Sequence, residues 1–173
     1  NLNSIFLIGY SSSFPQVGIK SCTFTCTQTL RRPNLGLRSQ SGIYLVNAGN
    51  ITIGNLTTTQ TNLFNGLQNG IVNYFSNNLR IYDNRFENIR DYNNTQLTGA
   101  GAAIYANNGG DYTTKYSILI RTLNGSSATS SSAVKFFNCD KGVTLWNFGG
   151  DVKVNRMQNI TSGVQAFQVQ NGK

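Results

Sequence analysis

The 173-residue sequence predicts an all-β fold in which short strands stack in parallel as a solenoid. The first observation is a repeat, because a small residue followed by alternating apolar residues recurs at steps of 28, 33, 30 and 30 residues from Gly42 onward. The second is the pattern inside each copy, where Ile, Val, Thr and Tyr form short runs that Gly, Asn and Ser interrupt. Such a fixed period is typical of repeat architectures.

The first strand of each copy has the same direction, so successive copies are expected to stack in parallel rather than pair as hairpins. The clearest copy is residues 42–56, which predicts a strand, a tight polar turn and a second strand. The small residues that begin the copies are Ser4, Gly42, Gly70, Ala103, Ala133 and Gly163. The predicted inward columns are Ile43, Ile71, Ile104, Val134 and Val164, and then Leu45, Asn73, Ala106, Phe136 and Ala166. Asn73 is polar and does not fit an inward column, so it indicates a bulge or a different register.

A second strand is expected in four copies, at residues 19–24, 51–56, 79–83 and 143–148. Each contains a short polar residue four positions after its first apolar residue, and these residues are Thr23, Asn55, Asp83 and Asn147. Short polar side chains favour tight turns because they bond nearby backbone groups and tolerate left-handed geometry. We expect them to form one stacked column of turns.

Through the pattern G-I-x-L…N-I-x-I-x-N-x-F, the chain resembles the right-handed parallel β-helix repeat proteins, which include pectate-lyase-like enzymes and many secreted surface proteins. The resemblance covers nearly the whole chain. It implies a right-handed parallel β-helix of about 5–6 coils of roughly 28–33 residues, and a secreted or cell-surface location. We expect residues 1–173 to form a single β-helix segment of a longer chain, with inserted loops at 29–40 and 91–101.

The net charge of +8, from 14 Lys and Arg against 6 acids, makes a polysaccharide or another polyanion a plausible partner. A solvated basic surface is the simpler explanation of the same charge. Only Arg31 and Arg32 are adjacent, whereas nucleic-acid binding favours a dense basic patch, so nucleic acid is not the expected partner. The sequence contains no run of about 18 apolar residues, so it predicts no membrane span.

Candidate catalytic chemistry is scarce in the sequence. Without histidine, Ser–His and Cys–His nucleophile systems and His-ligated metals are excluded. No two acids occupy matching positions on neighbouring copies, and Asp83, Glu87 and Asp91 are expected to line one face of a short helical turn as solvated ion pairs. We therefore expect no catalytic residue, no metal and no cofactor. Cys22 and Cys26 lie too far apart along a strand to join, so the three cysteines are expected to be free.

The family resemblance also implies an enzymatic alternative. Pectate-lyase-like enzymes generally use a calcium-binding acidic cluster with an Arg or Lys base. Arg80 and Lys135 are predicted to point outward, but no acidic cluster shares their face. A polysaccharide lyase or glycoside hydrolase therefore remains the alternative, and a structural subunit of a fibre or surface filament, with other subunits as partners, is the third class.

The sequence feature that points to a function is a set of outward aromatic residues. The predicted outward columns of the first strands are Phe6, Tyr44, Val72, Tyr105, Lys135 and Gln165, and then Ile8, Val46, Tyr74, Asn107, Phe137 and Phe167. A contiguous exposed apolar strip marks an interaction site, unless loops 29–40 and 91–101 cover it. The sequence thus predicts a non-catalytic scaffold or binding module for carbohydrate or another partner. Its predicted contact residues are Tyr44, Tyr74, Tyr105, Lys135, Arg80, Tyr82 and Trp146.

Overall fold

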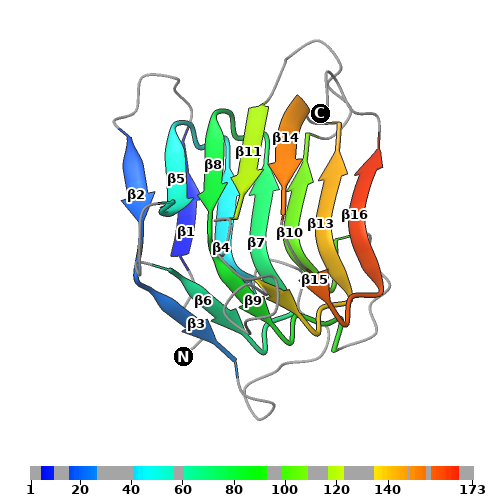
Figure 1. Cartoon of the computed structure of the whole chain (residues 1–173). Coiled ribbons are helices and arrows are strands. Elements are labelled where there is room, and N and C mark those ends of the chain that lie inside the picture. The colour runs from blue at the N-terminus through cyan, green and yellow to red at the C-terminus, as the bar shows by residue number, and fades with distance from the viewer. Residues whose placement is uncertain are drawn as a thin grey trace.

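The computed structural model is all-β, with three parallel sheets (Figure 1). It describes residues 5–9, 16–26, 41–56, 61–92, 99–108, 117–122, 135–147, 149–154 and 157–167. Within these ranges no helix is long and apolar enough to cross a membrane.

The strands divide among three sheets, named here A, B and C. Sheet A contains β1 (Ile5–Ile8), β4 (Ser41–Val46), β7 (Asn69–Tyr74), β10 (Ala102–Asn107), β13 (Lys141–Trp146) and β16 (Ser162–Phe167). Sheet B contains β2 (Val17–Ile19), β5 (Ile51–Gly54), β8 (Leu79–Tyr82), β11 (Ser117–Arg121) and β14 (Gly149–Lys153). Sheet C contains β3 (Thr23–Thr25), β6 (Leu63–Asn65), β9 (Arg85–Glu87), β12 (Phe136–Phe137) and β15 (Met157–Gln158).

The chain visits sheets A, B and C in turn and then returns to A, so each repeat adds one strand to every sheet. In Figure 1 sheet B lies in front of sheet A, sheet C lies below both, and the colours run from blue to red along the stack. The inward side chains of all three sheets, among them Ile43, Ile53 and Phe64, form one hydrophobic core. The predicted all-β fold of stacked parallel strands is confirmed, and it is consistent with a β-helix-like solenoid.

The inward column of sheet A differs from the prediction in one copy. Ile43, Ile71 and Ile104 are in register as expected, but the next member is Val143 rather than Val134. The steps are 39 residues from Ile104 to Val143 and 21 from Val143 to Val164. The average of these two steps equals the spacing expected from the sequence. The repeat pattern therefore selected Val134 in place of Val143. Val134 itself lies outside the described residues.

This correction reassigns two predicted strands. Residues 143–148 were expected as a second strand, but residues 141–146 form β13 of sheet A. Phe136 was expected in the inward column of the first strands, but it lies in sheet C opposite Phe86. Asn73, the predicted misfit, keeps its register between Leu45 and Ala106, so there is no bulge. It is buried, and its amide donates to the Ser76 carbonyl at 3.5 Å.

Sheet C was not predicted, because its strands are only two or three residues long, which is too short for alternation to be recognised in the sequence. Each strand contributes one large inward side chain. Successive rings of Phe24, Phe64, Phe86 and Phe136 stack with centroids 4.7, 4.9 and 5.0 Å apart. Stacked phenylalanines of this kind gain ring contact in addition to buried apolar area.

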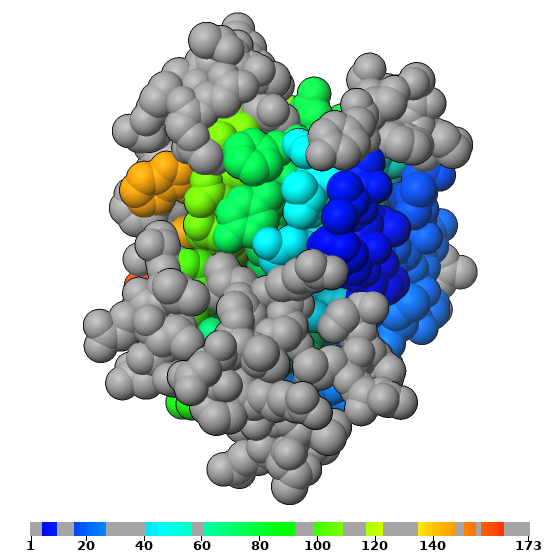
Figure 2. All heavy atoms as spheres, turned by 180° about the vertical axis from the view of Figure 1, so that it is seen from behind, coloured from blue at the N-terminus to red at the C-terminus, as the bar shows by residue number. Residues whose placement is uncertain are grey.

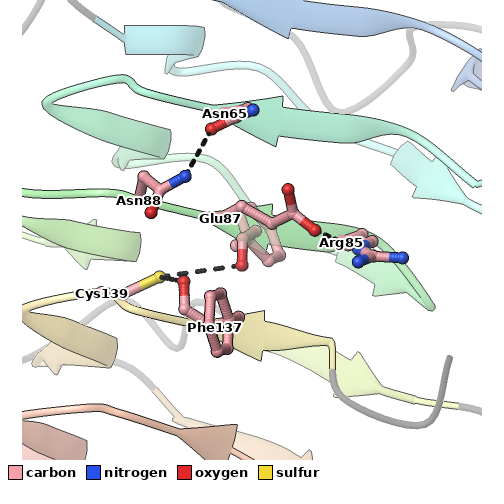
Figure 3. Close-up of polar contacts among 7 residues, drawn as sticks. Asn65, Arg85, Glu87, Asn88, Phe137 and Cys139 are labelled. Carbon is pink, nitrogen blue, oxygen red and sulfur yellow. Dashed lines mark hydrogen bonds and ion pairs between the residues drawn. The ribbon is translucent and has the colours of Figure 1, made fainter. Parts of the chain in front are cut away.

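Polar turns repeat as expected, although not as one column. Asn55 and Asp83 follow adjacent strands of sheet B, whereas Thr23 lies in β3 and Asn147 follows β13 in sheet A. Beside sheet C, the Asn88 amide donates to Asn65 at 2.9 Å and the Asn138 amide to Asn88 at 2.6 Å. Figure 3 shows the first of these bonds. The predicted helical turn at residues 83–91 is wrong, because residues 85–87 form strand β9.

The predicted loop at 29–40 lies outside the described residues. Of the loop at 91–101, the structure describes 91–92 and 99–101, and the Gly101 amide donates to the Gln68 carbonyl at 3.0 Å. The three cysteines are free, as predicted. Cys26 and Cys139 are buried, and the Cys139 thiol contacts the carbonyls of Phe86 and Phe137 (Figure 3).

Candidate functional site

The outer face of sheet A carries most of the aromatic side chains predicted to bind a ligand. Side chains alternate across a strand, so the residues between the core positions point outward. Parallel register places them in two rows, Phe6, Tyr44, Val72, Tyr105 and Thr144, and then Ile8, Val46, Tyr74, Asn107 and Trp146. We call these ten residues the aromatic wall. Both predicted rows are reproduced over four strands, and Thr144 and Trp146 replace Lys135 and Phe137 on the fifth.

Ring contacts run across neighbouring strands of the wall. The centroids of Phe6 and Tyr44 lie 5.6 Å apart, those of Tyr44 and Tyr74 5.7 Å, and those of Tyr74 and Tyr105 5.8 Å. The first two pairs are tilted and the last meets edge to face, arrangements that aromatic quadrupoles favour. Four rings from β1, β4, β7 and β10 therefore form one continuous aromatic path along the stack.

The wall is partly open at β1 and at the tyrosines of β4 and β7, and it is closed in its middle. Phe6 is 37% exposed and Ile8 57%, and Tyr44 and Tyr74 are half-buried. By contrast, Val72 is fully buried and Tyr105 only 4% exposed. In Figure 2 this face is a band in which blue, cyan, green and orange strands lie side by side. Tyr44 and Tyr74 can touch a ligand directly, whereas Tyr105 mainly supports Tyr74.

Hydroxyl and amide groups add polarity to this part of the wall. The Asn107 amide donates to the Tyr105 hydroxyl at 2.6 Å, and the hydroxyls of Tyr74 and Tyr105 also interact. Burial, and then the neighbouring Tyr105 and Tyr44, raise the pKa of Tyr74 above its ordinary value. The Tyr74 hydroxyl is protonated, as an ordinary tyrosine is at neutral pH, and it is already bonded to Tyr105.

Two predicted contact residues lie on another sheet. Arg80 and Tyr82 are half-buried on the outer face of β8 in sheet B. Arg121 of β11 and Lys153 of β14 lie in register with Tyr82. Both cations contact Asp151, at 2.7 Å from Arg121 and 3.7 Å from Lys153. Sheet B thus presents a basic face that is separate from the aromatic wall.

Lys135 was predicted to be an outward residue of the first-strand sheet, and this placement is wrong. It precedes β12 of sheet C, and its ammonium lies 3.0 Å from the Asp83 carboxylate. The two side chains are 15% and 4% exposed. Because each charge neutralises the other in a poorly hydrated site, Lys135 acts as a structural partner of Asp83.

The acids also differ from their predicted arrangement. Asp91 and Asp140 meet on neighbouring repeats, where the Asp91 backbone amide donates to the Asp140 carboxylate at 2.8 Å. Glu87 pairs with Arg85 (Figure 3). Among the residues that the structure describes, no three His, Cys, Asp or Glu side chains gather as a metal site would require.

A small apolar cleft lies beside the wall and was not predicted. It has a volume of about 160 Å³ and is lined by Leu7, Ile8, Gly9, Val17, Ala48, Gly49 and Ile51. These residues come from β1, β2, β5 and the turn before β5, so only the parallel register brings them together. No local sequence signal could have indicated the cleft.

The chain matches no protein-family model, no curated protein and no solved structure. Its function therefore has to follow from the geometry of these faces, of which the aromatic wall is the one with contiguous, partly exposed rings.

Proposed function

We propose that this chain is a non-catalytic carbohydrate-binding module built as a right-handed parallel β-helix of about 5–6 coils. The proposed location is secreted or on the cell surface, where extended glycans are abundant. The proposed contact surface is the aromatic wall, with Tyr44 and Tyr74 as the main contact residues and Phe6 and Trp146 at its edges.

The observation that carries this proposal is the path of rings at 5.6 and 5.7 Å from Phe6 through Tyr44 to Tyr74. The negative face of an aromatic ring attracts the weakly positive C–H groups on the face of a sugar ring. Because neighbouring strands lie about 4.8 Å apart, the path offers successive platforms along the solenoid axis. A linear glycan can lie along such a path and contact several rings at once.

A non-catalytic role is supported by how the described acids are used. Glycoside hydrolysis needs two carboxyl groups that flank one bond, one protonated and one ionised. Asp83, Glu87 and Asp151 are instead held in ion pairs, and Asp140 accepts from a backbone amide. These contacts suit structural roles.

Affinity electrophoresis tests the proposal. The wild-type chain is run through gels that contain soluble β-glucan, xylan, galactomannan or polygalacturonate, beside Tyr44→Ala, Tyr74→Ala and the matched control Tyr82→Ala on sheet B. We expect at least one glycan to retard the wild type. The affinity should fall about tenfold in Tyr44→Ala and Tyr74→Ala but not in Tyr82→Ala, since one lost ring contact removes about 1.4 kcal/mol.

Two results would contradict the proposal. Retardation that survives both wall substitutions would place binding elsewhere. Release of reducing or unsaturated ends from any of these glycans would make the protein an enzyme. Circular dichroism and thermal unfolding of each variant check that a lost interaction does not reflect a lost fold.

A further inference from the structure

We infer that the glycan bound on the aromatic wall is uncharged, although the chain as a whole carries a net charge of +8. This inference rests on the proposed function and names the class of ligand. It runs against the expectation from composition, which favours an acidic polymer.

The wall itself carries no ionisable cation or acid. Its two rows consist of aliphatic, aromatic, threonine and asparagine side chains. The nearest cation on the described part of sheet A is Lys141, at the start of β13. Its ammonium donates to the Ala100 carbonyl at 3.0 Å, so it is engaged at the edge of the sheet.

The cations of sheet B, of which only Arg80 was predicted to be a contact residue, lie away from the wall. Arg80, Arg121 and Lys153 project from sheet B, which faces sheet A across the core (Figure 1). Facing sheets pack about 10 Å apart, while charges in solvent are screened within about 8 Å at physiological ionic strength. The basic face therefore contributes little attraction to an anion bound on the opposite side.

Lys135, the remaining predicted cation, is also unavailable. Its charge is matched by Asp83 at 3.0 Å beside sheet C. Among the residues that the structure describes, an anionic ligand on the wall would thus find no cationic partner to offset the water lost around its charge, and that loss is costly.

What the wall does offer suits hydroxylated neutral rings. Tyr44 and Tyr74 are partly exposed. The neutral Tyr74 hydroxyl and the half-buried Asn107 amide lie in neighbouring positions of the same row. Neutral donors and acceptors of this kind bond sugar hydroxyls, whereas carboxylate or sulfate groups are bound best by cations.

Titration with neutral and acidic glycans at two salt concentrations tests the inference. Binding of wild-type protein is measured by isothermal titration with a neutral set (β-glucan, xylan and galactomannan oligosaccharides) and an acidic set (oligogalacturonate and dextran sulfate) at 50 and 500 mM NaCl. The variants are Tyr74→Ala on the wall, and Arg80→Gln and Lys153→Gln on sheet B. The two sheet B variants each remove one charge and leave the wall intact.

We expect a neutral oligosaccharide to bind with an affinity that changes less than twofold between the two salt concentrations and is unaltered in Arg80→Gln and Lys153→Gln. Tyr74→Ala should weaken it about tenfold. A wall that prefers the acidic set, shown by binding that Tyr74→Ala abolishes, would overturn this inference while leaving the proposed function in place. Absence of binding to both sets would overturn both.

Discussion

Gly70 in β7 lies directly against the ring of Phe86 in sheet C. A Cβ atom on Gly70 would stand 2.6 Å from Cδ1 of Phe86, and one on Gly42 would stand equally close to Cδ1 of Phe64. The glycines that open two of the repeats, Gly42 and Gly70, are thus explained: they leave room for the phenylalanine stack where sheet C meets sheet A.

This contact predicts a steep cost for a single methyl group. Gly70→Ala should lower the free energy of unfolding by about 3 kcal/mol, since the backbone of Ala103 also blocks the new atom and overpacked cores lose about 1–3 kcal/mol. Gly18→Ala in β2 is the matched control, because its nearest neighbour would be Cε of Lys20 at 3.7 Å. Urea unfolding of both variants measures the difference. Equal stabilities would show that the stack does not limit this position.

The ion pair of Lys135 and Asp83 predicts a non-additive double mutant. Lys135→Met leaves the Asp83 carboxylate poorly hydrated and unneutralised, and should cost about 2 kcal/mol. Asp83 has a positive φ of 49°, which asparagine tolerates. Asp83→Asn combined with Lys135→Met should therefore recover most of the loss. A double-mutant cycle by chemical denaturation tests this, and simple addition of the two single effects would argue against a coupled pair.

The asparagine turns beside sheet C predict an order among substitutions. Asn88 has a φ of 54° and bonds Asn65 and Asn138 through its side chain. Asn88→Gly keeps the backbone conformation and loses only the side-chain bonds, whereas Asn88→Ala also adds about 1–2 kcal/mol of left-handed strain. Thermal unfolding should rank wild type above Asn88→Gly, and Asn88→Gly above Asn88→Ala. An alanine variant as stable as the glycine variant would contradict the backbone argument.

Cys139 predicts a loss of stability at alkaline pH. Burial raises the pKa of its thiol from 9.0 to about 12. A raised pKa in the folded state means that the folded protein holds this proton more tightly than the unfolded chain. Its contribution to stability is complete below pH 9 and falls as the pH rises toward 12. Between pH 8 and 10.5, wild type should lose more unfolding free energy than Cys139→Ala, and equal slopes would exclude the thiol as the cause.

Alternation over four to six residues was enough to predict five of the six strands of sheet A, all but β13, together with β5 and β8 of sheet B. The predicted strand at 19–24 is divided between β2 and β3, and β11 and β14 were not predicted. Ile43, Ile71 and Ile104, and outside them Tyr44 and Tyr74, lie where the pattern placed them. The pattern failed where a repeat contains a long insertion, since equal spacing then selected residues near Val134 in place of Val143.

Other features depend on contacts between repeats that no local pattern encodes. In sheet C, four of the five strands contribute one stacked phenylalanine each and β15 contributes Met157. Lys135 meets Asp83 across 52 residues of the sequence. The division of the predicted contact residues between two sheets follows from the same register. Arg80 and Tyr44 both alternate outward, but only the fold decides that they face opposite directions.

Trp146 is the only tryptophan of the chain and lies on the wall, so its fluorescence reports directly on the central claim that ligands bind there. A titration with the glycan that retards the wild type should give a saturable change in emission, unaltered in Tyr82→Ala and shifted about tenfold to higher ligand concentration in Tyr44→Ala. Binding detected by calorimetry without any change in Trp146 emission, or with the same midpoint in Tyr44→Ala, would contradict the account.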